Sequence, residues 1–180
     1  MSSTRETMHI PGNILGVLCR TSGPVGAFHW IIFLCTDNTN GVMFHVINPD
    51  EQDPDRWEFS TGSWDALKSK SCLTIALVGR VVTFDPRDPS RATDTMRQCL
   101  QSVPLAVPPE DRGREPRFTC RVWFAAALRR LMSHRAFQLI KTPEEIMESM
   151  RNRTTAVQFM ETRNISLPLF IQPQPRSAYR

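Results

Sequence analysis

The sequence has no apolar run long enough to cross a bilayer. Its longest run, Val25–Cys35, is interrupted by His29 and falls far short of the roughly 20 residues that a membrane-spanning helix needs. The first residues, Met1–Asn13, are polar and lack the basic and apolar segments of a secretory signal. We therefore expect no membrane partner and a cytoplasmic protein.

The sequence also lacks the cysteine patterns of a disulfide framework or a metal site. Its five cysteines are odd in number and irregular in spacing, with no CxxC pair and no Cys/His cluster at ligand spacing. They are Cys19, Cys35, Cys72, Cys99 and Cys120. We expect free thiols in a reducing compartment, no bound metal and no other cofactor.

No nucleic-acid-binding motif accompanies the mildly basic composition. The formal net charge is +4 and the isoelectric point is about 9.0. The basic residues concentrate in Arg112–Arg135 and Arg176–Arg180, without aromatic residues interleaved on strands. The pattern is typical of a solvated basic face, so we expect no nucleic-acid partner; the oligomeric state stays open.

The chain is long enough for one hydrophobic core, and 41% of its residues are hydrophobic. Its first half has the residue pattern of strands and its second half that of helices, which predicts an α+β domain over 1–165. A proline-rich tail is expected over 166–180. The expected strands are 14–19, 28–35, 42–47, 57–64 and 73–84, with a bulge at Gly79, and the expected helices are 90–100, 119–134 and one beginning at Pro143.

Cys120 is the first candidate for chemistry. Thr119 is a suitable N-cap, which places Cys120 in the first turn of the helix. Unpaired N–H groups and the positive end of the helix dipole favour a thiolate at such a position. A lone cysteine in a helix is, however, more often a small buried apolar residue, so position alone leaves a structural role open.

A thiolate nucleophile needs a nearby base, most often histidine. His134 lies at the far end of the same helix, about 20 Å away at roughly 1.5 Å per residue, and His9 lies in the polar start. His29 and His45 remain, on neighbouring strands. A turn centred on Asp37 sets the two opposite each other, whereas a turn at Asn40-Gly41 does not. Either histidine could also be a satisfied core residue.

The segments around these residues resemble a known family. They are Phe28-His29-Trp30-Ile31-Ile32-Phe33-Leu34, Val42-Met43-Phe44-His45-Val46 and Thr119-Cys120-Arg121-Val122-Trp123-Phe124. In this order they are similar to the lecithin:retinol acyltransferase-like family, a circularly permuted branch of the papain-like, NlpC-type cysteine hydrolases. Residues 14–135 as a whole are also similar to a group of uncharacterised fungal proteins. The family typically has Asn where Thr119 stands here.

The resemblance implies an antiparallel sheet packed on helices, in a permuted papain-like arrangement. Cys120 would be the nucleophile, His29 the general base and His45 the orienting residue. The implied function is acyl transfer, cyclisation or hydrolysis on a small molecule, such as a secondary metabolite. Trp30, Trp123 and Arg121 would line the substrate site. The alternative is a non-catalytic domain that keeps the same frame and binds a ligand or partner.

Overall fold

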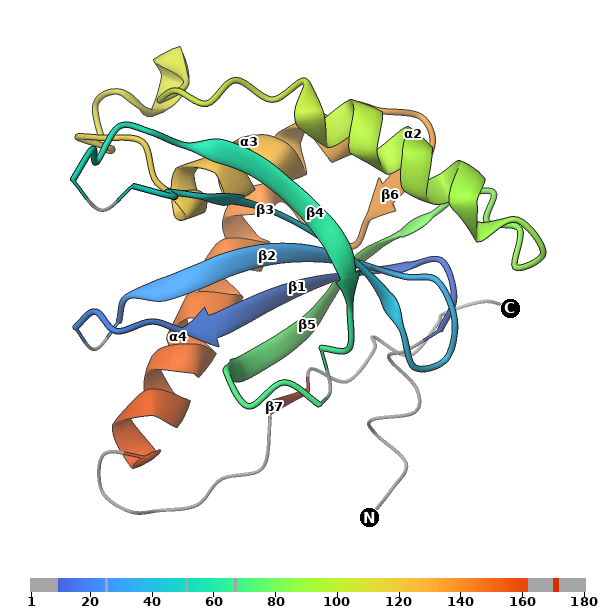
Figure 1. The fold of residues 1–180 in the computed structure, drawn as a ribbon, viewed down its shortest axis with the longest axis horizontal. Coiled ribbons are helices and arrows are strands. Elements are labelled where there is room, and N and C mark those ends of the chain that lie inside the picture. The colour runs from blue at the N-terminus through green and yellow to red at the C-terminus, as the bar shows by residue number, and fades with distance from the viewer. Residues whose placement is uncertain (1–9, 25, 51, 67, 162–169, 172–180) are drawn as a thin grey trace.

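The computed structural model describes residues 10–24, 26–50, 52–66, 68–161 and 170–171. The elements run in the order β1 (Asn13–Arg20), β2 (Phe28–Cys35), β3 (Gly41–Ile47), β4 (Glu58–Trp64), β5 (Cys72–Val81), α2 (Pro89–Gln101), a 3-10 turn η1 (Pro109–Asp111), α3 (Cys120–Met132), β6 (Phe137–Leu139), α4 (Pro143–Glu161) and β7 (Phe170–Ile171). Strands therefore precede helices along most of the chain, as the sequence predicts (Figure 1).

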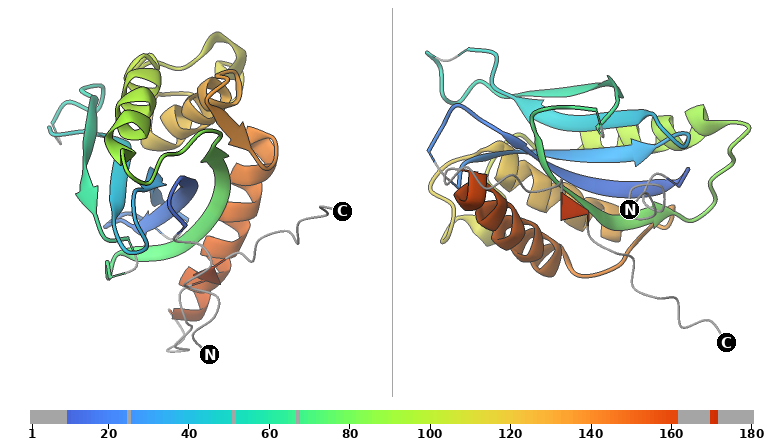
Figure 2. Two further views of the ribbon diagram at one scale, coloured as in Figure 1. Left: turned by 90° about the vertical axis from the view of Figure 1, so that its right-hand side faces the viewer. Right: turned by 90° about the horizontal axis from the view of Figure 1, so that it is seen from below.

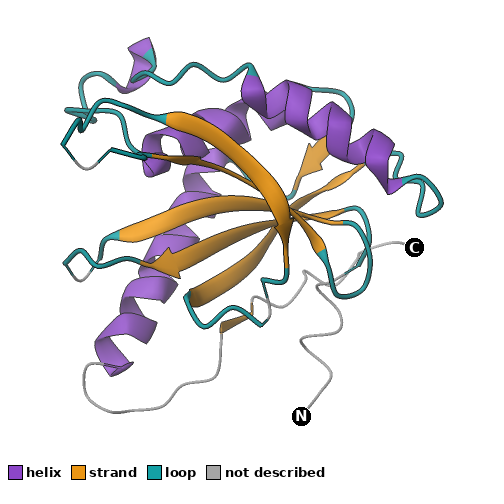
Figure 3. Cartoon of the chain, in the orientation of Figure 1, coloured by secondary structure: helices purple, strands orange, loops and turns teal. Residues whose placement is uncertain are grey.

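The strands form one mixed sheet. Its main path has the antiparallel order β4-β3-β2-β1-β5-β6, and β7 pairs in parallel with β5. The expected tail lies outside the described residues except for β7, and β6 was not expected. The sheet is strongly curved, with the three helices gathered against it (Figures 2 and 3). The predicted α+β class and antiparallel sheet packed on helices are confirmed.

Two apolar clusters lie on opposite faces of the sheet. The larger, which we call the helix-side core, takes alternate residues of β2 together with buried residues of α2, α3 and α4. The smaller, the outer cluster, takes the intervening residues of β2 and no helical residue. Phe28, Trp30, Ile32 and Leu34 face the helices, whereas Ile31, Phe33 and Cys35 face the outer side. Because side chains alternate along a strand, this pattern assigns every β2 residue to one face.

The helices begin where their capping residues predict. Thr119 has extended backbone angles and its hydroxyl accepts the Val122 N–H at 3.3 Å, so α3 starts at Cys120. The α4 helix starts at Pro143 after a capping box, in which Thr142 and Glu145 exchange backbone-to-side-chain hydrogen bonds. The first cap was predicted from the sequence. The second has an equally local signal.

The register of the β2–β3 hairpin differs from both registers considered for it. Ile32 pairs with Phe44, and Cys35 pairs with Gly41. The turn is shaped by Asp37, whose carboxylate accepts the N–H groups of Thr39 and Asn40 at 2.7 and 2.6 Å. The hairpin is thus centred beyond Asp37 and before Asn40-Gly41.

Candidate functional site

His29 and His45 form a directly bonded pair. The Nε2 atom of His29 lies 2.7 Å from Nδ1 of His45, and the rings meet edge to face. Continuing the β2–β3 register sets His45 opposite Ile31, so His29 is its diagonal neighbour on the same face of the sheet. The predicted meeting of the two histidines is found, through a diagonal contact and not through a directly opposite pair.

Both imidazoles are neutral near pH 7. Burial, and after it the charge of His45, lower the pKa of His29 to about 4. Burial likewise lowers the pKa of His45, which is only 9% exposed. In a neutral pair one nitrogen donates and the other accepts, so each ring holds the other in a fixed tautomer.

Cys120 lies at the start of α3, as expected, but its thiol has a backbone partner. Its Sγ donates to the Phe28 carbonyl oxygen across 3.7 Å. Burial raises the pKa of the Cys120 thiol, and nearby backbone N–H groups, that of Trp30 first, offset this only in part. The N–H groups at the start of the helix therefore favour the thiolate, as expected, but desolvation outweighs them and the net shift of the pKa is upward.

Among the described residues, Cys120 makes no hydrogen bond with either imidazole. Trp30 packs against Phe124 of α3, with ring centroids 5.1 Å apart, so even-numbered residues of β2 face the helices. His29, between Phe28 and Trp30, projects from the outer face. On β3, Phe44 belongs to the helix-side core, so His45 shares that outer face. The structure brings the histidines together and places Cys120 against the β2 backbone beside them.

The three residues expected to line a substrate site have partners within the fold. Trp123 is fully buried and packs against Phe59. Trp30 is 2% exposed, in the contact with α3 described above. Arg121 forms an ion pair with Glu115. Trp30 and Arg121 nevertheless both line a cavity of about 430 Å³ between α3 and α4.

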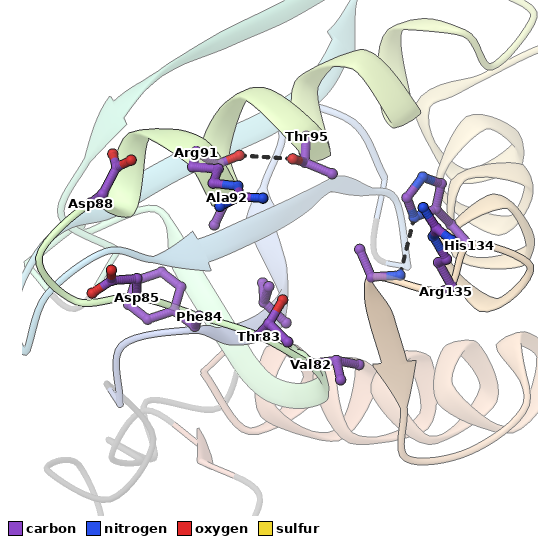
Figure 4. Close-up of a pocket in the computed structure, with 12 residues that line it drawn as sticks. Val82, Thr83, Phe84, Asp85, Asp88, Arg91, Ala92, Thr95, His134 and Arg135 are labelled. Carbon is purple, nitrogen blue, oxygen red and sulfur yellow. Dashed lines mark hydrogen bonds between the residues drawn. The ribbon is translucent and has the colours of Figure 1, made fainter.

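A larger cavity, of about 810 Å³, lies beside the N-terminal half of α2. Figure 4 shows its wall: Arg91 reaches in from α2, His134 and Arg135 follow α3, and Phe84 lies on the segment after β5. The lining combines apolar residues with Arg91, Arg135, Asp85 and Asp88. Sequence reasoning missed this site, because its walls come from three separate segments and share no motif.

Within the described residues, no group of three or more His, Cys, Asp or Glu side chains is arranged to hold a metal ion. None of the described helices is both long and apolar enough to traverse a bilayer. Comparisons with protein-family models, with curated proteins and with solved structures each found no match.

Proposed function

We propose that this chain is a ligand-binding domain, and that its ligand is a small anion with an apolar body, held in the 810 Å³ cavity beside α2. The observation that carries this proposal is the pair of arginines that face this cavity, Arg91 and Arg135. Among the described residues, neither guanidinium is in an ion pair. Cationic groups in a concave site are the usual means of fixing an anionic ligand.

The neighbouring acids are engaged elsewhere. Asp85 accepts the Arg87 N–H at 2.9 Å, and Asp88 accepts the hydroxyl of Ser90. The Ser90 contact, and less strongly the charge of Arg91, lower the pKa of Asp88. Both carboxylates thus cap local turns, and neither forms an ion pair with Arg91 or Arg135 among the described residues.

The 430 Å³ cavity is the natural comparison. There Arg129 is paired with Asp111 at 2.6 Å and with Glu144 at 3.3 Å, and Arg121 is paired with Glu115. Three of its four lining arginines, Arg114, Arg121 and Arg129, pair with carboxylates of the fold, and only Arg151 is in no ion pair among the described residues. The cavity beside α2 has arginines without such partners and, in Phe84 and Ala92, an apolar surface for the rest of a ligand.

A fluorescence titration with anilinonaphthalene sulfonate, an aromatic anion, tests the proposal. We expect saturable binding that weakens at least about tenfold when Arg91→Gln and Arg135→Gln are combined, because a charge-assisted hydrogen bond contributes roughly 1.5–3 kcal/mol. Arg97→Gln is the matched control, since Arg97 lies on the same helix and pairs with Asp94 outside the cavity. Equal binding by all three proteins would overturn the proposal.

Cysteine-dependent acyl transfer, cyclisation or hydrolysis on a small molecule is the second candidate. The observation that favours it is the meeting of three residues from separate segments of the chain. Cys120 forms a hydrogen bond with the residue before His29, and His29 forms a hydrogen bond with His45. This second candidate function would be consistent with a permuted papain-like, NlpC-type fold and with a cytoplasmic location. Catalysis would require the Cys120 thiol to leave the Phe28 carbonyl and reach an imidazole.

Alkylation separates the two candidates. For the binding domain, iodoacetamide should modify Cys120 slowly below about pH 7, and His29→Ala should not change the rate, because the thiol is protonated and has no base. For the enzyme, alkylation should be fast and should slow greatly in His29→Ala. Intact-mass measurement after incubation with a cell extract adds a direct check, since an acyl adduct absent from Cys120→Ala would support the enzyme.

A further inference from the structure

Four polar side chains cross the outer face of the sheet in one row. His45 on β3 contacts His29 on β2, His29 pairs in register with Cys19 on β1, and Cys19 pairs with Cys72 on β5. The row occupies four adjacent strands, and each half of it is joined by a side-chain contact. The histidine half is described above; the cysteine half has no part in the proposed binding site.

A bulge in β5 brings Cys72 to this face. Leu18 pairs with Thr74, but Cys19 pairs with Cys72, so β5 has one extra residue, Leu73. Leu73 belongs to the helix-side core, and the hydroxyl of Thr74 accepts a hydrogen bond from Thr154 of α4. Two successive residues therefore face the helices. Without the extra residue, Cys72 would point to the helices, away from Cys19.

The two sulfur atoms lie in the position from which a cross-strand bond can form. Their Sγ atoms are 3.9 Å apart. The adjacent Arg20 N–H donates to the Ser71 carbonyl at 2.8 Å, which makes Arg20/Ser71 the hydrogen-bonded pair and Cys19/Cys72 the non-hydrogen-bonded one. Non-hydrogen-bonded pairs have Cα atoms about 4.5 Å apart, within the range that a disulfide spans.

We propose that Cys19 and Cys72 form a thiol–disulfide exchange site, at which a low-molecular-weight disulfide such as oxidised glutathione oxidises the pair to a cross-strand disulfide. Cys72 meets the oxidant and Cys19 completes the bond. Access sets this order, because Cys72 is half-buried beside the exposed Ser71, whereas Cys19 is 5% exposed.

The electrostatics of the pair favour loss of one proton with the resting negative charge on Cys19, so access, and not charge, selects Cys72 as the attacking residue. The hydrogen bond from Cys72 lowers the pKa of Cys19, with a smaller contribution from Ser71 in the same direction, while the contact with Cys19 raises the pKa of Cys72. The pair thus loses one proton readily and shares the other between two sulfurs. By contrast, burial raises the pKa of Cys99 and Cys120, and that of Cys35 to about 12.

The reaction proceeds in two exchanges. The Cys72 thiolate, its proton shared onto Cys19, attacks one sulfur of oxidised glutathione; a protein–glutathione disulfide forms and one glutathione thiolate leaves. Cys19 then gives up its proton and attacks the Cys72 sulfur, forming the Cys19–Cys72 bond and releasing the second thiolate. The protons of the two protein thiols end on two molecules of glutathione. Two protein thiols are oxidised and one disulfide is reduced.

Intact-mass spectrometry of the folded protein in oxidised glutathione tests the site. Wild type should lose two hydrogens without keeping an adduct, and peptide mapping should join the segments of Cys19 and Cys72. Cys19→Ser should retain one glutathione at Cys72, because the second exchange is blocked. Cys72→Ser should stay largely unmodified, because Cys19 is covered. The control Cys99→Ala should behave as wild type, since Cys99 lies on α2.

Other outcomes would overturn the proposal. One is wild type that stays fully reduced in excess oxidised glutathione while its circular dichroism shows a folded chain. Another is a stable glutathione adduct on Cys72 in wild type that Cys19 does not displace. A disulfide between any other two cysteines of the chain, or one between two protein cysteines in Cys19→Ser, would be equally decisive against it. Circular dichroism on each variant separates these results from simple unfolding.

Discussion

The two faces of the sheet share the same strands but hold different chemistry. The helix-side core includes residues from α2, α3 and α4 and encloses Cys120 as a protonated thiol bonded to the backbone. The outer face carries a smaller apolar cluster and the row of His45, His29, Cys19 and Cys72. The His29–His45 and Cys19–Cys72 contacts both lie on the face whose apolar cluster includes no residue of a described helix. Strand parity, and not distance along the chain, decides which groups can react together.

The largest expected loss of stability follows the truncation of a buried aromatic side chain in either apolar cluster. Phe124 on the helix side and Phe33 on the outer side are both fully buried. We expect Phe124→Ala and Phe33→Ala each to lower the free energy of unfolding by about 3–5 kcal/mol, through lost burial and the cavity left behind. Urea unfolding followed by circular dichroism measures this. A cost below about 1 kcal/mol for Phe33→Ala would show that the outer cluster is not a second core. Val82→Ala, at a 54% exposed position, is the control.

The next effect is a pH dependence specific to the outer face. The pKa of His29 is lowered to about 4 in the folded state, against about 6.5 in an unfolded chain. As pH falls below about 6.5 the unfolded chain binds a proton that the folded chain does not. The contribution of His29 to stability is therefore complete above pH 6.5 and is lost as pH falls towards 4, by up to about 3 kcal/mol.

Subtracting the unfolding free energy of His29→Gln from that of wild type, at each pH between 4 and 7.5, isolates this term. The difference should grow as pH rises through that window. If the difference in unfolding free energy between wild type and His29→Gln did not vary with pH, the imidazole would not be held neutral by burial.

The smallest effect should separate the two faces. Thr119→Ala removes the N-cap of α3 and should lower the free energy of unfolding by about 1 kcal/mol. Because Thr119 lies on the helix side, the pH-dependent part of stability that His29 supplies should not change. Thr119→Ser, which keeps the hydroxyl, is the matched control. If Thr119→Ala altered the pH profile, the two faces would be coupled more closely than the structure indicates.

Local signals in the sequence predicted much of the fold. The apolar residues of β2 and β3, the cap at Thr119 and the start of α4 at Pro143 all depend on residues close together in the chain, and each is found. The bulge expected at Gly79 also appears, as a shift in register between Ile14 and Leu15. The capping box of Thr142 and Glu145 was equally readable.

The geometry of the candidate sites could not be predicted from local sequence signals, because it depends on contacts between distant segments. Asp37 caps its own turn with two N–H groups, which moves the hairpin centre and makes the contact between His29 and His45 diagonal. Burial reverses the shift in the pKa of Cys120 that its helix position favours. The cavity around Arg91 and Arg135 is assembled from segments that share no motif. Each of these features depends on which elements pack together.

The sequence by itself determined the α+β class and most of the order of strands and helices, because both follow from local periodicity and turn chemistry. Only the tertiary structure decided which face each reactive group occupies. One extra residue at Leu73 turns Cys72 towards Cys19, and regular alternation along β2 places His29 on the outer face. A one-residue change in strand pairing reverses a side chain's face, and pairing is set by contacts between distant segments.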